Sequence, residues 1–149
     1  MTTIRRLLLL PFLLGPLVLP EALAKPPEAE QAQTGLVFAL RTGLEDEIAL
    51  ESAFRHAKVV KESGTVSEVT IVVYGRAIVV FDPGVTLPAD LKTSFEGARS
   101  AGVRIVACET ALRKYGIPTD EAARSADVVP QGIVEIARLV ASGQEVLSY

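Results

Sequence analysis

Cys108 is the residue of this sequence best suited to covalent chemistry, and it is the only cysteine in the chain. A β-branched apolar run, Val103 to Ala107, precedes it, and a helix-like segment, Glu109 to Tyr115, follows it. This order predicts a buried parallel strand that leads into a helix. The thiol would then lie at the carboxyl end of a strand, where open α/β sheets bind ligands, and beside a helix N-terminus, which favours a thiolate.

The surroundings of Cys108 leave two interpretations open. Free backbone N–H groups of Glu109 and Thr110 would donate hydrogen bonds to a thiolate, whereas the Glu109 carboxylate would repel it if it pointed toward the sulfur. Lone cysteines also often behave as small buried hydrophobic residues. The alternative to a reactive thiol is therefore an inert core position.

Polar and glycine-containing breaks follow the other predicted strands at the same edge of the sheet. The segment Tyr74-Gly75-Arg76 offers a phenolic hydroxyl for hydrogen bonding and a guanidinium group that could attract an anion. The alternative is that Gly75 only turns the chain and that Arg76 is a solvated surface charge. Thr42-Gly43 and Pro130-Gln131-Gly132 occupy equivalent places after two other strands. We predict that this edge binds a small ligand or a partner through Thr42, Gly43, Tyr74, Gly75, Arg76, Glu109, Thr110, Pro130, Gln131 and Gly132.

Short apolar runs alternate with segments of helical periodicity after residue 34, which predicts an α/β three-layer sandwich with a mostly parallel five-stranded sheet. Residues 77–81 fit either a short helical turn or an extended piece. The predicted strands are residues 36–40, 66–74, 103–107, 126–129 and 145–149, and the predicted helices are residues 42–62, 86–101, 109–115, a short one from 119, and 133–142.

Capping and periodicity give these helices predicted ends and faces. Thr42 and Glu45 fit a capping box, Thr119 fits an N-cap, and Gly64 fits a C-terminal stop. His56 is expected at the surface of the first helix. The apolar residues on one face of each predicted helix are expected to face the core. They are Ile48, Leu50, Ala53, Phe54, Ala57 and Val60 in the first helix, Leu91, Phe95 and Ala98 in the second, and Ile133, Ile136, Ala137 and Val140 in the last.

The N-terminal 24 residues predict a secretory signal peptide, because Arg5 and Arg6 precede an apolar run and Ala22-Leu23-Ala24 fits the cleavage pattern. An uncleaved anchor is the alternative, but the run is short for a membrane span and contains two prolines. The arginine pair also fits a twin-arginine signal. We predict a flexible linker over 25–34, a single domain over 35–149, and a periplasmic or secreted protein with no membrane span after cleavage.

Composition excludes several other classes of function. The chain has a net charge of −3, so it lacks the basic surface of nucleic-acid-binding or anionic-lipid-binding proteins. A single cysteine forms no intrachain disulfide, and a single histidine leaves no zinc-ligand cluster. We expect no metal and no cofactor, and no serine–histidine–aspartate or paired-carboxylate motif indicates a hydrolase.

Four segments of the sequence carry a resemblance when taken together and in order: Val72 to Gly75, Gly102 to Thr110, Gly116-Ile117 and Val128 to Leu139. They resemble the DsrE/DsrF-like family of small α/β sulfur-relay proteins, especially its exported branch of unknown function. The resemblance implies a five-stranded parallel sheet flanked by helices, related to the flavodoxin-like folds. It also implies homo-oligomers such as dimers, trimers or hexamers.

Cys108 matches the cysteine that carries sulfur as a persulfide in sulfur-transferring members of the family. The resemblance therefore implies a sulfurtransferase-like carrier, or a thiol sensor, that exchanges sulfur with a donor or acceptor protein. The alternative is a non-catalytic oligomeric module that binds a small ligand or a partner and has a structural cysteine.

Overall fold

Five parallel strands form the centre of the fold, in the order β4-β3-β2-β1-β5. The computed structural model describes residues 35–149, so the predicted signal peptide and linker, residues 1–34, lie outside the described residues. The predicted α/β architecture with a parallel five-stranded sheet is confirmed. The strands are β1 (Gly35–Leu40), β2 (Glu68–Val73), β3 (Arg104–Cys108), β4 (Asp127–Val129) and β5 (Glu145–Ser148).

The burial of each strand follows its place in the sheet. The central strands β1 and β2 are buried along almost their whole length, which explains why they are apolar runs rather than alternating patterns. The edge strands β4 and β5 are only three and four residues long and are partly exposed. Short edge strands limit unwanted pairing with other chains.

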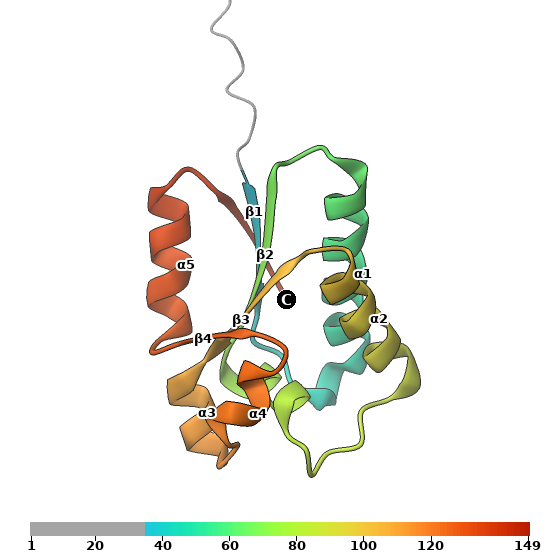
Figure 1. Cartoon of the computed structure of the whole chain (residues 1–149), viewed down its shortest axis with the longest axis vertical. Helices are drawn as coiled ribbons and strands as arrows, with labels where there is room; N and C mark the ends of the chain where they lie inside the picture. Colours follow the sequence, from blue (N-terminus) through green and yellow to red (C-terminus); the bar gives the residue numbers. More distant parts are fainter. Residues whose placement is uncertain (1–34) are drawn as a thin grey trace, which may run out of the picture. The chain divides into compact units, whose positions relative to one another are not determined.

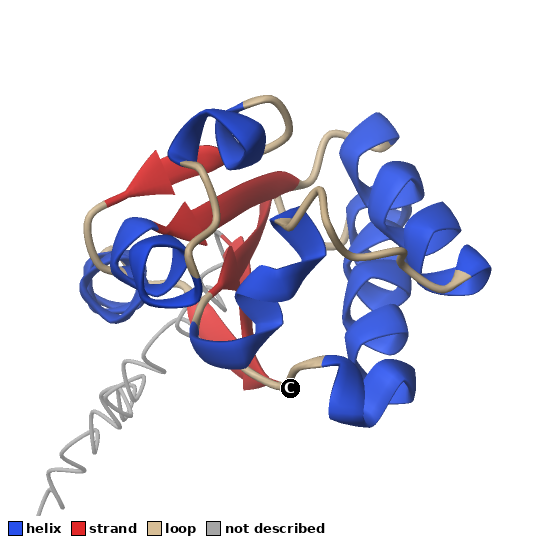
Figure 2. Ribbon diagram, turned by 90° about the horizontal axis from the view of Figure 1, so that it is seen from below, coloured by secondary structure: helices blue, strands red, loops and turns tan. Residues whose placement is uncertain are grey.

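Helices cover both faces of the sheet (Figure 1). The helices α1 and α2 pack on one face, α5 lies on the other, and the short α3 and α4 lie toward the carboxyl end of the strands. Figure 2 views the molecule from that end. The helices are α1 (Glu47–Ser63), α2 (Ala89–Ser100), α3 (Glu109–Tyr115), α4 (Thr119–Ala123) and α5 (Gly132–Ala141), with 3₁₀ turns η1 (Leu44–Asp46) and η2 (Gly75–Phe81).

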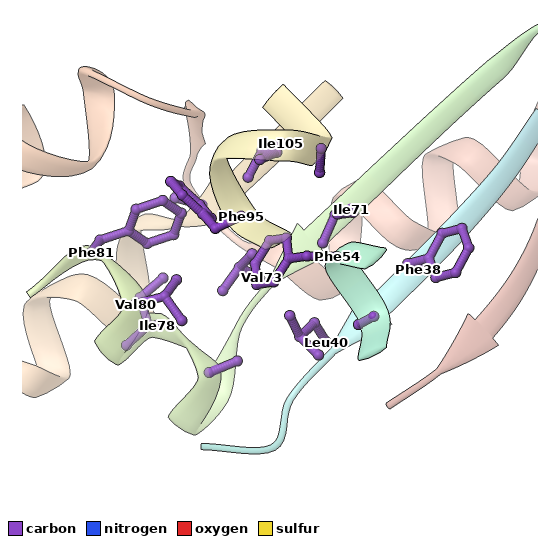
Figure 3. Packing of buried hydrophobic residues seen from close by; sticks show 14 of the residues in the cluster. Phe38, Leu40, Phe54, Ile71, Val73, Ile78, Val80, Phe81, Phe95 and Ile105 are labelled. Atoms are coloured by element: carbon purple, nitrogen blue, oxygen red, sulfur yellow. The ribbon is translucent and has the colours of Figure 1, made fainter. Parts of the chain in front are cut away.

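Aromatic side chains join the helices on the α1/α2 face of the sheet (Figure 3). Phe95 of α2 makes edge-to-face contacts with Phe54 of α1, at a ring-centroid distance of 5.2 Å, and with Phe81 of η2, at 6.0 Å. Such contacts add to the stabilisation from buried area. The segment 77–81, whose structure the sequence left open, is thus helical and anchored in the core through Phe81.

The inward face of α5 is not the one that its periodicity suggested. Ile136 and Leu139 pack against the sheet, whereas Ile133 and Val140 are 59% and 49% exposed and Ala137 also faces outward. The helix has apolar stripes on two sides, so the hydrophobic pattern did not identify the buried one. The prediction was correct only for Ile136.

The start of α1 also differs from the prediction. The 3₁₀ turn η1 intervenes after β1, and Asp46 caps the helix by accepting a hydrogen bond of 3.0 Å from the Ala49 N–H. The predicted cap Thr42 is therefore wrong. Because the helix begins at Glu47, its register leaves Ile48 79% exposed instead of buried.

Two other helix ends were predicted with different success. Pro118, not Thr119, occupies the N-cap position of α4, because Thr119 is already its first helical residue. Gly64 ends α1 with φ of 67°, a left-handed conformation that favours glycine, and its N–H donates to the Lys61 carbonyl. The predicted stop at Gly64 is confirmed.

Candidate functional site

The carboxyl edge of the parallel sheet gathers the predicted site residues. Arg41 follows β1, Tyr74 follows β2, Cys108 ends β3 and Pro130 follows β4. These positions lie toward the lower end of the sheet in Figure 1, beside α3 and α4. Ligands of parallel α/β sheets bind at this edge, so its geometry decides what chemistry the fold offers.

Cys108 is held between the sheet and the first turn of α5. It is 7% exposed and occupies the N-cap position of α3. A Cβ atom placed on Gly132 would lie 3.0 Å from the Tyr74 Cβ and 3.2 Å from the Cys108 Cβ. A larger residue would be crowded at this position, where the backbone of Gly132 lies close to Cys108 and Tyr74.

The first turn of α3 is fastened to the segment that follows β4. Both the backbone N–H and the hydroxyl of Thr110 donate to the Pro130 carbonyl, at 3.3 Å and 2.9 Å. The expected free N–H of Thr110 is therefore already used and is not available to a thiolate. Glu109 pairs with Arg113 at 3.6 Å, which offsets the charge of this carboxylate beside Cys108.

A hollow of about 270 Å³ begins one strand away from Cys108. Val129, which is the register partner of Cys108 in the β3–β4 pair, lines this hollow. We call it the β4 hollow; its described lining residues are Val129, Pro130, Gln131, Val134 and Glu135. Cys108 itself is not among these lining residues, which come from the end of β4, the loop after it and α5. Pro130 and Gln131 therefore belong to the hollow and are linked to Cys108 only through the neighbouring strand.

A second hollow of about 330 Å³ contains the other predicted residues. Gly75 adopts φ of 59°, and a Cβ there would lie 2.9 Å from Cγ of Arg41, so this glycine lets the Arg41 side chain pack across the backbone. We call it the cationic hollow; its described lining residues are Arg41, Thr42, Gly75, Arg76, Lys114 and Tyr115. The structure therefore divides the predicted pocket into two parts.

Glu45 forms the rim of the cationic hollow. Its carboxylate accepts hydrogen bonds from the Gly43 N–H at 3.1 Å and from the Arg76 guanidinium at 2.8 Å. Hydrogen bonds from its own N–H and from that of Gly43, together with the charge of Arg76, lower the pKa of the Glu45 carboxyl. Gly43 is buried beneath this carboxylate and lies outside the hollow lining.

Sequence reasoning missed several residues of this edge and of its surroundings. Arg41 directly follows β1, so its position at the carboxyl edge was a signal that could have identified it. Lys114 and Tyr115 reach the same hollow only because α3 ends there, which no local pattern indicates. At the opposite end of the sheet, Arg104 and Arg138 bind Glu135, whose i,i+3 spacing to Arg138 was the available signal.

A model of the DsrE/DsrF-like family matches residues 23–149. The chain belongs to the DsrE/DsrF-like family. The match spans both hollows and Cys108, so all candidate residues lie within the family region. No curated protein sequence matches the chain.

Solved structures share the fold of this DsrE/DsrF-like chain. A conserved protein of unknown function, BT1422 from Bacteroides thetaiotaomicron, is 16% identical, with a TM-score of 0.64 over 81% of this chain and 99% of that one. MTH1491 from Methanobacterium thermoautotrophicum, also of unknown function, is 21% identical, with a TM-score of 0.61 over 77% and 98%. The ychN protein from E. coli is 19% identical, with a TM-score of 0.60 over 78% and 99%. At these identities the likeness establishes the fold alone.

Among residues 35–149, no three His, Cys, Asp or Glu side chains are grouped as a metal site would require. Within the same residues, no helix has the length and apolar character needed to cross a membrane.

Proposed function

We propose that this DsrE/DsrF-like protein is a sulfur carrier that holds sulfur as a persulfide on Cys108. The observation that carries the proposal is the place of the sole cysteine, at the carboxyl end of β3 and in the N-cap position of α3. Membership of a family linked to sulfur relay supports the same chemistry. The β4 hollow beside Cys108 supports an approach for a donor or acceptor protein from that side.

The transfer step is a thiol exchange that needs no oxidant. The Cys108 thiolate attacks the outer sulfur of a donor persulfide, R–S–SH, and the donor leaves as the thiolate R–S⁻. Cys108 then carries –S–SH, and the reverse reaction with an acceptor thiolate returns Cys108 to its starting form. The protein's contribution is to position the thiol and to shield the bound sulfur from solvent.

Intact-mass measurement tests the proposal. The purified full-length chain is incubated with a small persulfide donor, and its mass is compared before and after treatment with a reductant. We expect a gain of one sulfur atom that the reductant removes. A folded protein whose mass stays unchanged would contradict the proposal.

A second candidate is a non-catalytic binding module in which Cys108 is structural. The 7% exposure of Cys108 and the use of the Thr110 N–H by Pro130 favour this alternative. In that case Cys108 resists thiol reagents in the folded state and reacts only after denaturation. Comparing its labelling rate in buffer and in denaturant distinguishes the two candidates.

We further propose that the protein is a homo-oligomer and that the outward stripe of α5 forms the contact with a second copy. Ile133 and Val140 are 59% and 49% exposed on a helix whose other side already packs on the sheet. A helix that is apolar on two sides is typical of one buried between two partners. The homo-oligomers implied by the family resemblance supply the second partner.

Ile133→Glu is expected to weaken this association, because a charge in an apolar contact loses its hydration without gaining a partner. Val59→Glu on α1 is the matched control, since Val59 is 57% exposed and Ile133 is 59% exposed. Light scattering coupled to size-exclusion chromatography measures both variants. Equal effects of the two substitutions, or a wild-type chain that is monomeric throughout, would contradict the proposed interface.

We also propose that residues 1–24 direct export and are removed. The expected product in the exported fraction of cells expressing the full chain begins at Lys25, as measured by intact mass. Recovery of a chain that still begins at Met1 in the exported fraction would indicate a retained anchor and contradict cleavage. Recovery only from the cytoplasm would contradict export.

A further inference from the structure

The cationic hollow is a feature that sulfur carriage on Cys108 does not use. Its residues come from three separate parts of the chain: the segment after β1, the start of η2 and the end of α3. Lys114 lies six residues beyond Cys108, which is about 9 Å along a helix at the usual rise per residue. A molecule seated in this hollow therefore has its own binding residues, separate from the thiol.

The charge of the hollow is strongly one-sided. Of its described lining residues, three are basic and none is acidic. Arg76 pairs with Glu45 on the rim, but neither Arg41 nor Lys114 has a carboxylate partner within the described part of the chain. Gathering three cations in one concavity of an acidic protein is electrostatically unfavourable unless an anion binds there.

The backbone holds these cations in place. The Ala77 N–H donates to the Arg41 carbonyl at 3.2 Å, and Phe81 anchors the other end of the same 3₁₀ turn in the core. The left-handed conformation of Gly75 leaves room for the Arg41 stem. The Lys114 ammonium lies 5.9 Å from the ring centroid of Tyr115, which limits the freedom of that side chain.

The Glu45–Arg76 pair indicates what type of group the hollow accepts. A carboxylate oxygen of Glu45 already lies 2.8 Å from the Arg76 guanidinium at the rim. Guanidinium groups bind the oxygens of carboxylates and phosphates through paired, charge-assisted hydrogen bonds. Thr42 and Tyr115 also line the hollow, and both residue types carry hydroxyl groups that can donate hydrogen bonds to oxyanions.

We propose that the cationic hollow binds a small doubly charged oxyanion of the phosphate or sulfate type, with Arg41, Arg76 and Lys114 as its ligands. Two negative charges balance Arg41 and Lys114, the two cations that have no carboxylate partner among residues 35–149. A volume of about 330 Å³ admits such a group and a small organic substituent, but not a nucleotide cofactor in full. This site does not depend on the reactivity of Cys108, so Cys108→Ser retains it.

An NMR titration of the full-length chain with sodium sulfate tests the site, with sodium chloride at equal ionic strength as the reference. We expect saturable shifts of the backbone amide signals of Thr42, Gly75 and Lys114, with a dissociation constant of about 1 mM or lower. Shifts that rise linearly without saturation, or that map to other parts of the surface, would overturn the proposal.

Charge-removing variants separate a built site from general surface attraction. Arg41→Gln and Lys114→Gln each weaken sulfate binding about fivefold to tenfold, because each loses a charge-assisted contact. Arg113→Gln is the matched control: Arg113 is exposed on the same helix and pairs with Glu109 outside the hollow. Equal weakening by Arg113→Gln would mean that only net charge matters, and the site would be rejected.

Glu45→Gln is expected to change sulfate affinity in the direction opposite to that of Arg41→Gln and Lys114→Gln. Because the Glu45 carboxylate competes for Arg76, its neutral amide is expected to strengthen sulfate binding about threefold. Weaker binding by this variant would contradict the assignment of Arg76. Titrations with inorganic phosphate and with glycerol 3-phosphate then distinguish the two possible sources of the oxyanion. Tighter binding of glycerol 3-phosphate points to a phosphorylated metabolite, and equal binding of the two points to a free inorganic oxyanion.

Discussion

Cys108→Ser should abolish the reductant-sensitive gain of one sulfur atom, because this chain has no other cysteine to carry a persulfide. The substitution exchanges sulfur for oxygen at nearly the same size, so the packing against Gly132 and Tyr74 is retained. Intact mass after incubation with the persulfide donor measures the effect. The expected change is from full loading to none.

The controls for this prediction follow from the burial of Cys108. Placing a hydroxyl at a position that is 7% exposed costs about 1 kcal/mol where no partner accepts it, so thermal unfolding must accompany the mass data. Cys108→Ala avoids the buried hydroxyl and serves as a second variant. If either folded variant still gains a removable sulfur atom, Cys108 is not the carrier.

Glu135→Ala is expected to lower the free energy of unfolding by about 2–3 kcal/mol, because it removes a nearly buried carboxylate that binds two arginines. The Glu135 carboxylate is 10% exposed and accepts hydrogen bonds from Arg104 at 2.8 Å and from Arg138 at 2.7 Å and 2.9 Å. Without it, two guanidinium groups are left beside each other. Denaturant unfolding measures the loss.

An exposed ion pair provides the comparison for Glu135. Glu96 pairs with Arg99 at the same i,i+3 spacing, but the Glu96 side chain is 52% exposed. Glu96→Ala should therefore cost no more than about 0.5 kcal/mol, as is usual for solvated pairs. Equal losses in the free energy of unfolding for Glu96→Ala and Glu135→Ala would show that burial of the Glu135 carboxylate does not add to the strength of its ion pairs.

The same network predicts the acid sensitivity of the fold. Hydrogen bonds from Arg138 and then Arg104 lower the pKa of Glu135 from 4.5 to about 2. A lowered pKa in the folded state means that the stabilisation is present above pH 4.5 and is lost as the pH falls toward 2. Because both arginine partners are partly solvated, we expect this loss to be about 2 kcal/mol, and Glu135→Gln should remove this part of the pH dependence.

The strands were predictable because each is a short apolar run bounded by polar or glycine residues, and a buried parallel sheet needs little else. The buried face of α5 was not predictable from the sequence, because Ile133 and Val140 form as regular an apolar stripe as Ile136 and Leu139. In the structure the second pair packs on the sheet, and Gly132 at the start of the helix lies close to Tyr74 and Cys108. Which of two apolar stripes meets the sheet depends on this three-dimensional packing, and the periodicity of the sequence does not encode it.

The candidate site was predictable in part for a related reason. The rule that carboxyl ends of parallel strands share one edge brought Cys108, Gly75 and Pro130 to the same end of the sheet. It did not separate the two hollows, because their boundary depends on where α3 ends and on the path of the Arg41 side chain. Nor did it reveal that the Pro130 carbonyl uses the N–H of Thr110.

That double hydrogen bond at Pro130 has a mechanical consequence for the thiol. The Pro130 carbonyl oxygen accepts both hydrogen bonds from Thr110, so it joins the first turn of α3 to the loop after β4. Movement of this loop and movement of the turn are therefore coupled. Opening the turn costs the two bonds, each worth about 1 kcal/mol, unless an arriving molecule replaces them. A molecule that binds this loop and competes for the Pro130 carbonyl therefore also loosens the turn that begins at Cys108.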